Sequence, residues 1–373
     1  MSENQSILAA FQELSATGAA AALANVVRVT GSSYRRPGAR MLVASDGRTW
    51  GGVSGGCLER DVARRARTVI ETGLPAFCSF DTTEELDDPG AARGAALGCA
   101  GMIDIFIQRL SAAACGPMPW IQRAHEQRIA IAVATVVRSD GGNAIPGTCF
   151  TQDNAPPSVR EQLALLAPGK PTAFVQSDGA EFFVELIRPP QSLVVLGGGT
   201  DVVPVVTLSK TLGWHVTVIA SHASIGYQER FRAADVVTCG TDDAPFGGLT
   251  IQADSAVVMM THNYVRDLAV LGRLMDQSLK YLGILGPRRR AERLVAESGK
   301  RASGAMEKIY APVGLDIGGN TPETIALAIV AEIQAVLAGH DARSLRDRTG
   351  PIYEHASTES HKMYNPTTCP ISA

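Results

Sequence analysis

Apolar positions in the first half of the chain recur with both helical and strand spacing, which predicts a mixed α/β unit. Residues 5–16 repeat apolar side chains at helical intervals, and residues 22–29 form a short apolar run typical of a strand. The turn Ser45-Asp46-Gly47 between two apolar runs predicts a hairpin over 41–53. The same criteria predict strands at 76–80, 102–108, 129–137, 172–176 and 181–186, and helices at 117–127 and 157–167.

The second half predicts a unit of a different kind. Pro189 and Pro190 interrupt the chain, and an apolar strand over 192–196 then runs into the glycine turn 197–199. Strand, glycine turn, helix and strand in this order begin a Rossmann-type unit. Its later strands are predicted at 215–219, 234–238, 255–260 and 281–285, and its last helix between Thr321 and Gly339.

These patterns together predict an α/β protein with two folded units. We expect an N-terminal mixed α/β domain over residues 1–188, which contains the hairpin. A C-terminal Rossmann-like domain with a doubly wound parallel sheet follows over 191–339. Residues 340–373 are polar and are expected to form a tail.

The segment Val53-Ser54-Gly55-Gly56-Cys57-Leu58-Glu59 joins a predicted strand to a predicted helix. Ser54 is placed to cap that helix, which would make Gly55, Gly56 and Cys57 its first residues. Unpaired N–H groups at a helix N-terminus attract anions, and such a position also favours the thiolate form of a cysteine. The segment therefore predicts an anion-binding turn beside a soft sulfur ligand. The alternative is a plain tight turn in which Cys57 is a small buried residue.

Two further stretches add charge and sulfur to this picture. The loop 31–40 carries three arginines, whose guanidinium groups suit a phosphate or a polar heterocycle, although a solvated basic loop has the same composition. These arginines are Arg35, Arg36 and Arg40. The turn Gly98-Cys99-Ala100-Gly101 resembles the first glycine–cysteine turn in composition. If the strands bring the turns together, Cys57 and Cys99 would bind a soft metal or exchange sulfur.

The glycine turn of the second unit departs from the pattern that binds a dinucleotide. That pattern has a third glycine where this chain has Val202, and an acidic residue near Ser221 and His222. Asp201 is the expected N-cap of the following helix, where its carboxylate would repel a pyrophosphate. We therefore expect a Rossmann-like fold that does not bind NAD(P). His262, which follows a later strand, is a candidate proton or metal ligand, with a hydrogen-bonded structural histidine as the alternative.

Composition limits the classes of function. The chain has 373 residues, of which 45% are hydrophobic and 19% charged, and a net charge of −3, so nothing favours nucleic acid or an anionic membrane as a partner. We find no secretory signal and no apolar run long enough to span a bilayer. The seven cysteines are widely spaced and lack a C-x-x-C pair, which argues against a zinc knuckle or a disulfide framework. A cytoplasmic protein with reduced thiols fits best.

Several motifs occur in order between about Ala22 and Gly339, across both predicted domains. As a set they resemble the XdhC/CoxI family, whose members are maturation factors for xanthine dehydrogenase, carbon monoxide dehydrogenase and aldehyde oxidoreductases. The motifs are Gly38-Ala39-Arg40-Met41, Val53-Ser54-Gly55-Gly56-Cys57-Leu58-Glu59, His262 to Asp267, Tyr281 to Arg290, Pro312-Val313-Gly314-Leu315-Asp316-Ile317-Gly318 and Thr321-Pro322-Glu323.

The resemblance implies a chaperone rather than an enzyme. Such proteins bind and protect the molybdenum cofactor, a phosphorylated pterin, either as molybdopterin or as its cytidine dinucleotide form. They cooperate with a cysteine desulfurase that sulfurates the cofactor, and they insert it into an apo-molybdoenzyme of the xanthine dehydrogenase or aldehyde oxidoreductase type. A homodimer is also implied. The expected cofactor contacts are Gly55, Gly56, Cys57, Arg35, Arg36, Arg40, Cys99 and His262, with Cys57 and Cys99 as metal ligands.

This chain also departs from the family pattern at three places. Cys99-Ala100-Gly101 replaces Cys-Gly-Gly, Thr200-Asp201 replaces His-Val after the glycine turn, and Ser221-His222 replaces an acidic pair. These three changes weaken any expectation of a nucleotide in the second domain, and they leave the Cys57 region intact. Two alternative functions remain: an NAD(P)-dependent oxidoreductase that uses the Rossmann unit, and a cofactor-free adaptor between the desulfurase and the apo-enzyme.

Overall fold

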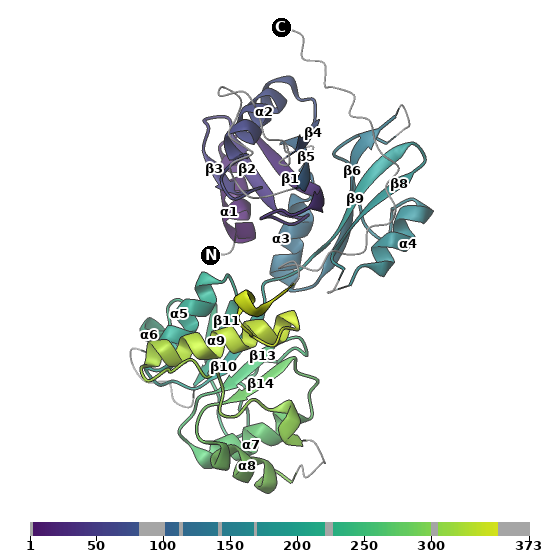
Figure 1. The fold of residues 1–373 in the computed structure, drawn as a ribbon. Coiled ribbons are helices and arrows are strands. Elements are labelled where there is room, and N and C mark those ends of the chain that lie inside the picture. Colours follow the sequence, from purple (N-terminus) through teal and green to yellow (C-terminus); the bar gives the residue numbers. More distant parts are fainter. Residues whose placement is uncertain are drawn as a thin grey trace.

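The computed structural model describes most of the chain and arranges it in three sheets (Figure 1). The described residues are 3–81, 101–111, 115–140, 144–167, 170–220, 227–299 and 305–349. Cys99, Ser221 and His222, together with the tail beyond residue 349, therefore lie outside the described residues.

The first sheet has the strand order β3-β2-β1-β5-β4, and all neighbouring strands are antiparallel. Its strands are β1 (Ala21–Gly31), β2 (Arg40–Ala44), β3 (Thr49–Gly51), β4 (Ala76–Asp81) and β5 (Gly101–Leu110). Because side chains alternate along a strand, β1 directs Ala22, Ala24 and Val26 toward helix α2 (Glu59–Thr72). Leu23 lies on the opposite face, where α1 (Glu3–Ala16) and α3 (Met118–Gln127) cover it.

The second sheet has the order β7-β6-β9-β8 and is also antiparallel. Its strands are β6 (Ile131–Ser139), β7 (Cys149–Phe150), β8 (Thr172–Ser177) and β9 (Ala180–Ile187). Helix α4 (Pro157–Leu165) covers its outer face. Its inner face packs on the first sheet through a buried cluster of Val27, Phe106, Val137 and Phe183. The N-terminal half is therefore a two-sheet sandwich with helices outside, whereas the sequence predicted the strands without their division into two sheets.

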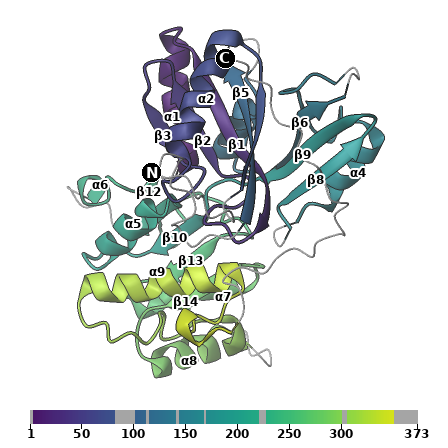
Figure 2. The ribbon, with the colours of Figure 1, turned by 45° about the horizontal axis from the view of Figure 1, so that its top comes forward.

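The third sheet is parallel throughout, in the order β12-β11-β10-β13-β14. Its strands are β10 (Ser192–Leu196), β11 (His215–Ala220), β12 (Val236–Cys239), β13 (Ala256–Met259) and β14 (Tyr281–Ile284). Helices α5 (Val202–Thr211) and α9 (Pro322–Ala338) lie side by side on one face (Figure 2), and α7 (Tyr264–Met275) and α8 (Arg288–Glu297) cover the other. Shorter elements are α6 (Tyr227–Arg230) and the 3₁₀ turns Ala305–Lys308 and Leu345–Asp347. The predicted Rossmann-like, doubly wound parallel sheet is confirmed.

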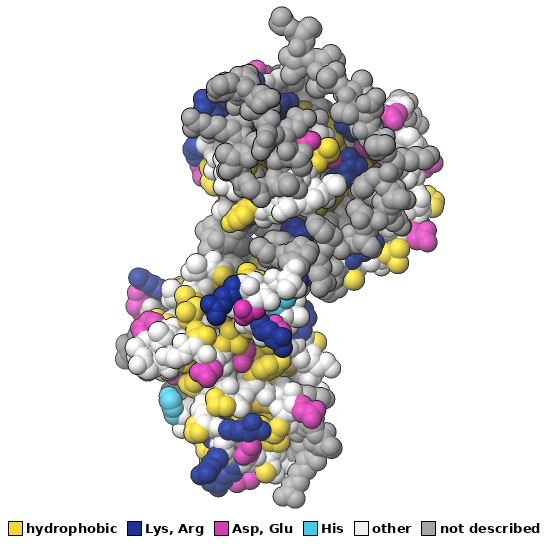
Figure 3. Space-filling view, viewed as in Figure 1, with side chains coloured by type: hydrophobic (Ala, Val, Ile, Leu, Met, Phe, Trp, Pro, Cys, Tyr) yellow, Lys and Arg dark blue, Asp and Glu magenta, His cyan; other side chains and the backbone are white. Residues whose placement is uncertain are grey.

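The last helix is also confirmed, with Thr321 as its cap, and it is apolar around most of its circumference. Leu327 consequently stays half exposed, and Figure 3 shows hydrophobic side chains at the surface over α5 and α9. No helix within the described ranges has both the length and the apolar character needed to cross a bilayer. The predicted domain limits stay a prediction, although β9 ends and β10 begins on either side of Pro189 and Pro190.

Candidate functional site

Three segments meet at one end of the first sheet. They are the loop 32–39 after β1, which we call the arginine loop, the turn 52–58 after β3, which we call the cysteine turn, and the start of β5 at Gly101. A methyl group on Gly55 would lie 3.6 Å from the Tyr34 ring, and one on Gly101 would lie 2.5 Å from the Ser32 carbonyl oxygen. The arginine loop therefore contacts both the cysteine turn, through the Tyr34 ring, and the start of β5, through its backbone. Whether the two glycine–cysteine turns themselves meet stays a prediction.

The helix after the cysteine turn begins later than predicted. It starts at Glu59, with Leu58 as an N-cap that offers no side-chain bond. The Ser54 hydroxyl instead accepts hydrogen bonds from the N–H groups of Gly56 (3.2 Å) and Leu58 (3.1 Å), which closes a turn before the helix. Gly56 has φ = +112°, which no helical residue adopts. The prediction that Gly55, Gly56 and Cys57 open the helix is wrong for this reason.

Cys57 itself lies at the surface and not in a core. Its side chain is exposed, and its sulfur lies 3.3 Å from the Ser54 hydroxyl. Within the described part of the chain, no hydrogen bond uses the N–H groups of Gly55 and Cys57. The alternative of a small buried cysteine is therefore wrong, and an exposed sulfur stands beside two backbone donors that no described residue uses.

The chain's own carboxylate fills part of the predicted anion-binding turn. Glu59 accepts hydrogen bonds from the N–H groups of Val53 (3.2 Å) and Ser54 (2.8 Å) and from the Ser54 hydroxyl. Burial by itself would raise the pKa of Glu59, but these hydrogen bonds outweigh it and hold the pKa below its usual value. An external anion is thus left with the donors beyond Ser54.

We expect Glu59→Gln to destabilise the protein at neutral pH more than at acidic pH. The folded-state pKa of Glu59 lies below its unfolded value, so the ionised carboxylate stabilises the fold above the unfolded pKa. This contribution is lost as the pH falls through the folded-state pKa. Thermal unfolding of both proteins across this range should show their midpoints converging toward low pH. A difference independent of pH would show that shape, and not charge, matters at this position.

The three candidate arginines differ in what surrounds them. Arg35 forms an ion pair with Glu3 of α1, whose carboxylate also accepts from the Gly52 N–H at 3.0 Å. Arg40 is 4% exposed, pairs with Glu185 of the second sheet and donates to the Gly38 carbonyl at 2.9 Å. The prediction that Arg40 contacts an external anion is therefore wrong, because its guanidinium is buried and already paired. Arg36 is half-buried in the arginine loop, and its role stays a prediction.

Two candidates remain, Cys99 and His262. Cys99 falls outside the described residues, so a shared site with Cys57 stays a prediction. His262 is exposed and belongs to the Rossmann unit, where its Nε2 lies 4.0 Å from the Asp201 carboxylate. In the ranges that the structure describes, no three His, Cys, Asp or Glu side chains form a group that would hold a metal.

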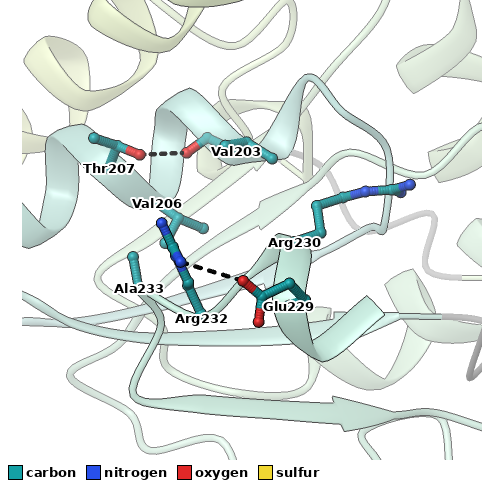
Figure 4. A pocket seen from close by; sticks show the side chains of 7 residues that line it. All are labelled: Val203, Val206, Thr207, Glu229, Arg230, Arg232 and Ala233. Atoms are coloured by element: carbon teal, nitrogen blue, oxygen red, sulfur yellow. Dashed lines mark hydrogen bonds and ion pairs between the residues drawn. The ribbon is translucent and has the colours of Figure 1, made fainter. Parts of the chain in front are cut away.

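The glycine turn of the Rossmann unit is occupied by an acidic side chain. Asp201 precedes α5 without a side-chain cap bond, and a methyl group on Gly199 would lie 2.1 Å from its carboxylate. Arg230 reaches the same turn and donates to the Gly198 carbonyl at 3.0 Å. Figure 4 shows the adjoining hollow, of about 460 Å³, where Glu229 pairs with Arg232. A pyrophosphate would meet the Asp201 carboxylate, which supports the expectation of no NAD(P).

Sequence reasoning missed three residues of the site. Glu59 had a recognisable signal, since a glutamate at a helix start near a serine often accepts backbone N–H bonds. Tyr34 and Glu3 had none, because their positions depend on contacts between distant segments.

The fold and site together define a class of protein in which a two-sheet sandwich that carries the cysteine turn precedes a Rossmann unit. Residues 14–81 match the model of the XdhC and CoxI family, and residues 193–333 match the XdhC Rossmann domain. A Bacillus subtilis protein, named as a probable subunit of xanthine dehydrogenase, is 30% identical over 323 residues, covering 84% of this chain and 92% of that protein. This chain belongs to the XdhC/CoxI family, and the resemblance seen in the sequence is confirmed.

Two further proteins are similar to this chain over nearly its full length. The molybdenum cofactor insertion chaperone PaoD of Escherichia coli is 24% identical over 338 residues, which is 90% of this chain and 89% of that protein. A crystal structure described as a xanthine dehydrogenase from Bacillus halodurans has a TM-score of 0.72 and 25% identity, and covers 94% of this chain and 98% of that one.

Proposed function

We propose that this protein is a maturation chaperone that binds the molybdenum cofactor at the cysteine turn and inserts it into an apo-molybdoenzyme. The name of the Escherichia coli relative supports a chaperone role rather than a catalytic one. The observation that carries the proposal is the exposed Cys57 thiol beside available backbone N–H groups. The cofactor is cargo in this proposal, and the chain holds it for transfer.

The chemistry of the cysteine turn fits the parts of this cargo. Molybdenum is a soft metal for which a thiolate is a suitable ligand. The N–H groups of Gly55 and Cys57 suit an anionic phosphate, and the exposed Tyr34 ring offers a flat apolar surface to a pterin. In this proposal the recipient is a xanthine dehydrogenase or an aldehyde oxidoreductase, and a cysteine desulfurase sulfurates the cofactor. The protein is proposed to act in the cytoplasm as a homodimer.

Co-purification tests this function directly. The protein is purified from cells that make the cofactor and from cells that cannot, and bound molybdenum and oxidised pterin are measured. We expect both in the first preparation and neither in the second. A protein that captures a desulfurase and an apo-molybdoenzyme while carrying no pterin would instead be the adaptor.

The oxidoreductase alternative makes a separate prediction. We expect calorimetric titration with NAD or NADP to show no binding tighter than about 1 mM, because the Asp201 carboxylate lies over the glycine turn. Asp201→Asn serves as the companion variant, since it removes the charge and keeps the shape. A micromolar complex of the unmodified protein would favour the oxidoreductase.

A further inference from the structure

The second sheet repeats the architecture of the first. Strands β2-β1-β5-β4 and β7-β6-β9-β8 follow the same order with the same antiparallel pairing. The long strand of each sheet has its irregularity at the same place, between Val26 and Arg28 in β1 and between Val136 and Arg138 in β6. Each sheet also carries a helix on its outer face.

The sequences of these strands correspond as well. Residues 22–28 read Ala-Leu-Ala-Asn-Val-Val-Arg and residues 132–138 read Ala-Val-Ala-Thr-Val-Val-Arg, with five of seven positions identical. The loop that follows each strand ends in Pro-Gly, and both glycines have positive φ, +94° at Gly38 and +93° at Gly147. The N–H of Gly38 donates to the Val26 carbonyl, and that of Gly147 to the Val136 carbonyl, both at 2.8 Å.

Contacts between the sheets are reciprocal, as a two-fold relation requires. The Arg28 guanidinium lies 4.6 Å from the Phe174 ring centre, and Arg138 lies 3.9 Å from that of Phe77. Each arginine also pairs with an acid on the neighbouring strand, Arg28 with Asp104 and Arg138 with Glu181. Four residues further along these strands are Gln108 and Glu185, which are therefore equivalent.

We propose that residues 131–187 are a second, divergent copy of the unit 21–110, and that Glu185 of this copy positions the arginine loop beside the cysteine turn. The family models match residues 14–81 and 193–333 and so leave the second copy without an assignment. The positioning role rests on the proposed cofactor function, whereas the duplication does not.

The two copies differ at the pair of residues that faces each loop. Glu185 faces Gly38 and pairs with Arg40, which also donates to the Gly38 carbonyl at the end of the arginine loop. In the equivalent place Gln108 faces Gly147, and Cys149 replaces Arg40. Burial raises the pKa of Cys149 to about 12, so the pair of Gln108 and Cys149 carries no charge.

A buried ion pair fixes geometry more than it adds stability. Two charges lose their hydration on burial, so a pair of apolar residues of similar size often stabilises a core at least as much as the ion pair does. Arg40 and Glu185 are 4% and 5% exposed, and the pair connects the arginine loop of one copy to a strand of the other. Glu185 is therefore a positioning residue, since it acts on the loop through Arg40.

Hydrogen exchange of the full-length protein tests both parts of the proposal. Glu185→Gln removes the charge and keeps the shape, and Gln108→Leu is the matched change in the other copy. We expect Glu185→Gln to speed exchange in residues 31–41 at least about tenfold and to leave 144–149 unchanged. We expect Gln108→Leu to speed exchange in residues 144–149 and to leave residues 31–41 unchanged. Equal effects on both loops, or none on residues 31–41 in Glu185→Gln, would overturn the proposal.

A double variant separates positioning from stability. Arg40→Met with Glu185→Leu removes both charges and should recover most of the thermal midpoint lost in Glu185→Gln, while residues 31–41 still exchange fast. Bound molybdenum should fall about tenfold in both Glu185 variants and stay unchanged in Gln108→Leu. Unchanged molybdenum in Glu185→Gln would contradict the positioning role. If the unmodified protein carries no cofactor, the proposed function fails, and the exchange pattern still decides whether Glu185 and Gln108 hold equivalent positions in the two copies.

Discussion

Replacing Cys57 by alanine is expected to lower the molybdenum bound to the purified protein at least about tenfold. The Cys57 sulfur is exposed and is the proposed soft ligand of the cysteine turn, so its loss removes the proposed bond to the metal. The backbone donors of Gly55 and residue 57 remain in the variant, so some pterin should stay bound. Elemental analysis and pterin fluorescence of the same preparation measure both quantities.

Cys239→Ala is the control for this experiment. Cys239 is a half-buried thiol at the end of β12, in the Rossmann sheet and not in the sheet that carries the cysteine turn, and its removal should leave the molybdenum content unchanged. Both variants should unfold at nearly the same temperature as the unmodified protein, because neither thiol lies in a core cluster. Equal molybdenum in Cys57→Ala and the unmodified protein would remove Cys57 from the site.

Gly101→Ala is expected to lower the free energy of unfolding by about 2–3 kcal/mol. The added methyl group would lie 2.5 Å from the Ser32 carbonyl oxygen and 2.7 Å from that of Thr30. Both neighbours are backbone atoms, so the end of β1 and the arginine loop must move away from β5. Chemical denaturation measures the loss, and the cysteine turn should bind the proposed cofactor more weakly as well.

Gly272→Ala provides the opposite expectation from the same substitution. Gly272 lies inside α7, where the nearest atom to an added methyl group is the Ser298 carbonyl oxygen at 3.9 Å. Alanine is favoured over glycine in a helix, so stability should rise by about 0.5–1 kcal/mol. A loss below about 0.5 kcal/mol in Gly101→Ala would show that the loop and the strand separate easily.

Much of the fold was predictable because its signals are local. Apolar spacing gave the strands and helices, and Pro189 and Pro190 mark the passage from the sandwich to the Rossmann sheet. Thr321 and Gly339 set the ends of the last helix through capping chemistry that the sequence displays. The predicted start of the helix after the cysteine turn was too early. Serine is a common N-cap residue, but the Ser54 hydroxyl closes a turn that precedes the helix.

The sequence by itself determined the order of elements, the Rossmann-like unit, the family and the cysteine turn. The tertiary structure alone decided that Cys57 is exposed, that Glu59 fills part of the turn and that Arg40 is buried against Glu185. The physical reason is that these features depend on contacts between residues far apart in the sequence. Hydrogen-bond geometry within a turn and an ion pair between residues 145 positions apart depend on how the sheets pack, and periodicity along the chain carries no record of that packing.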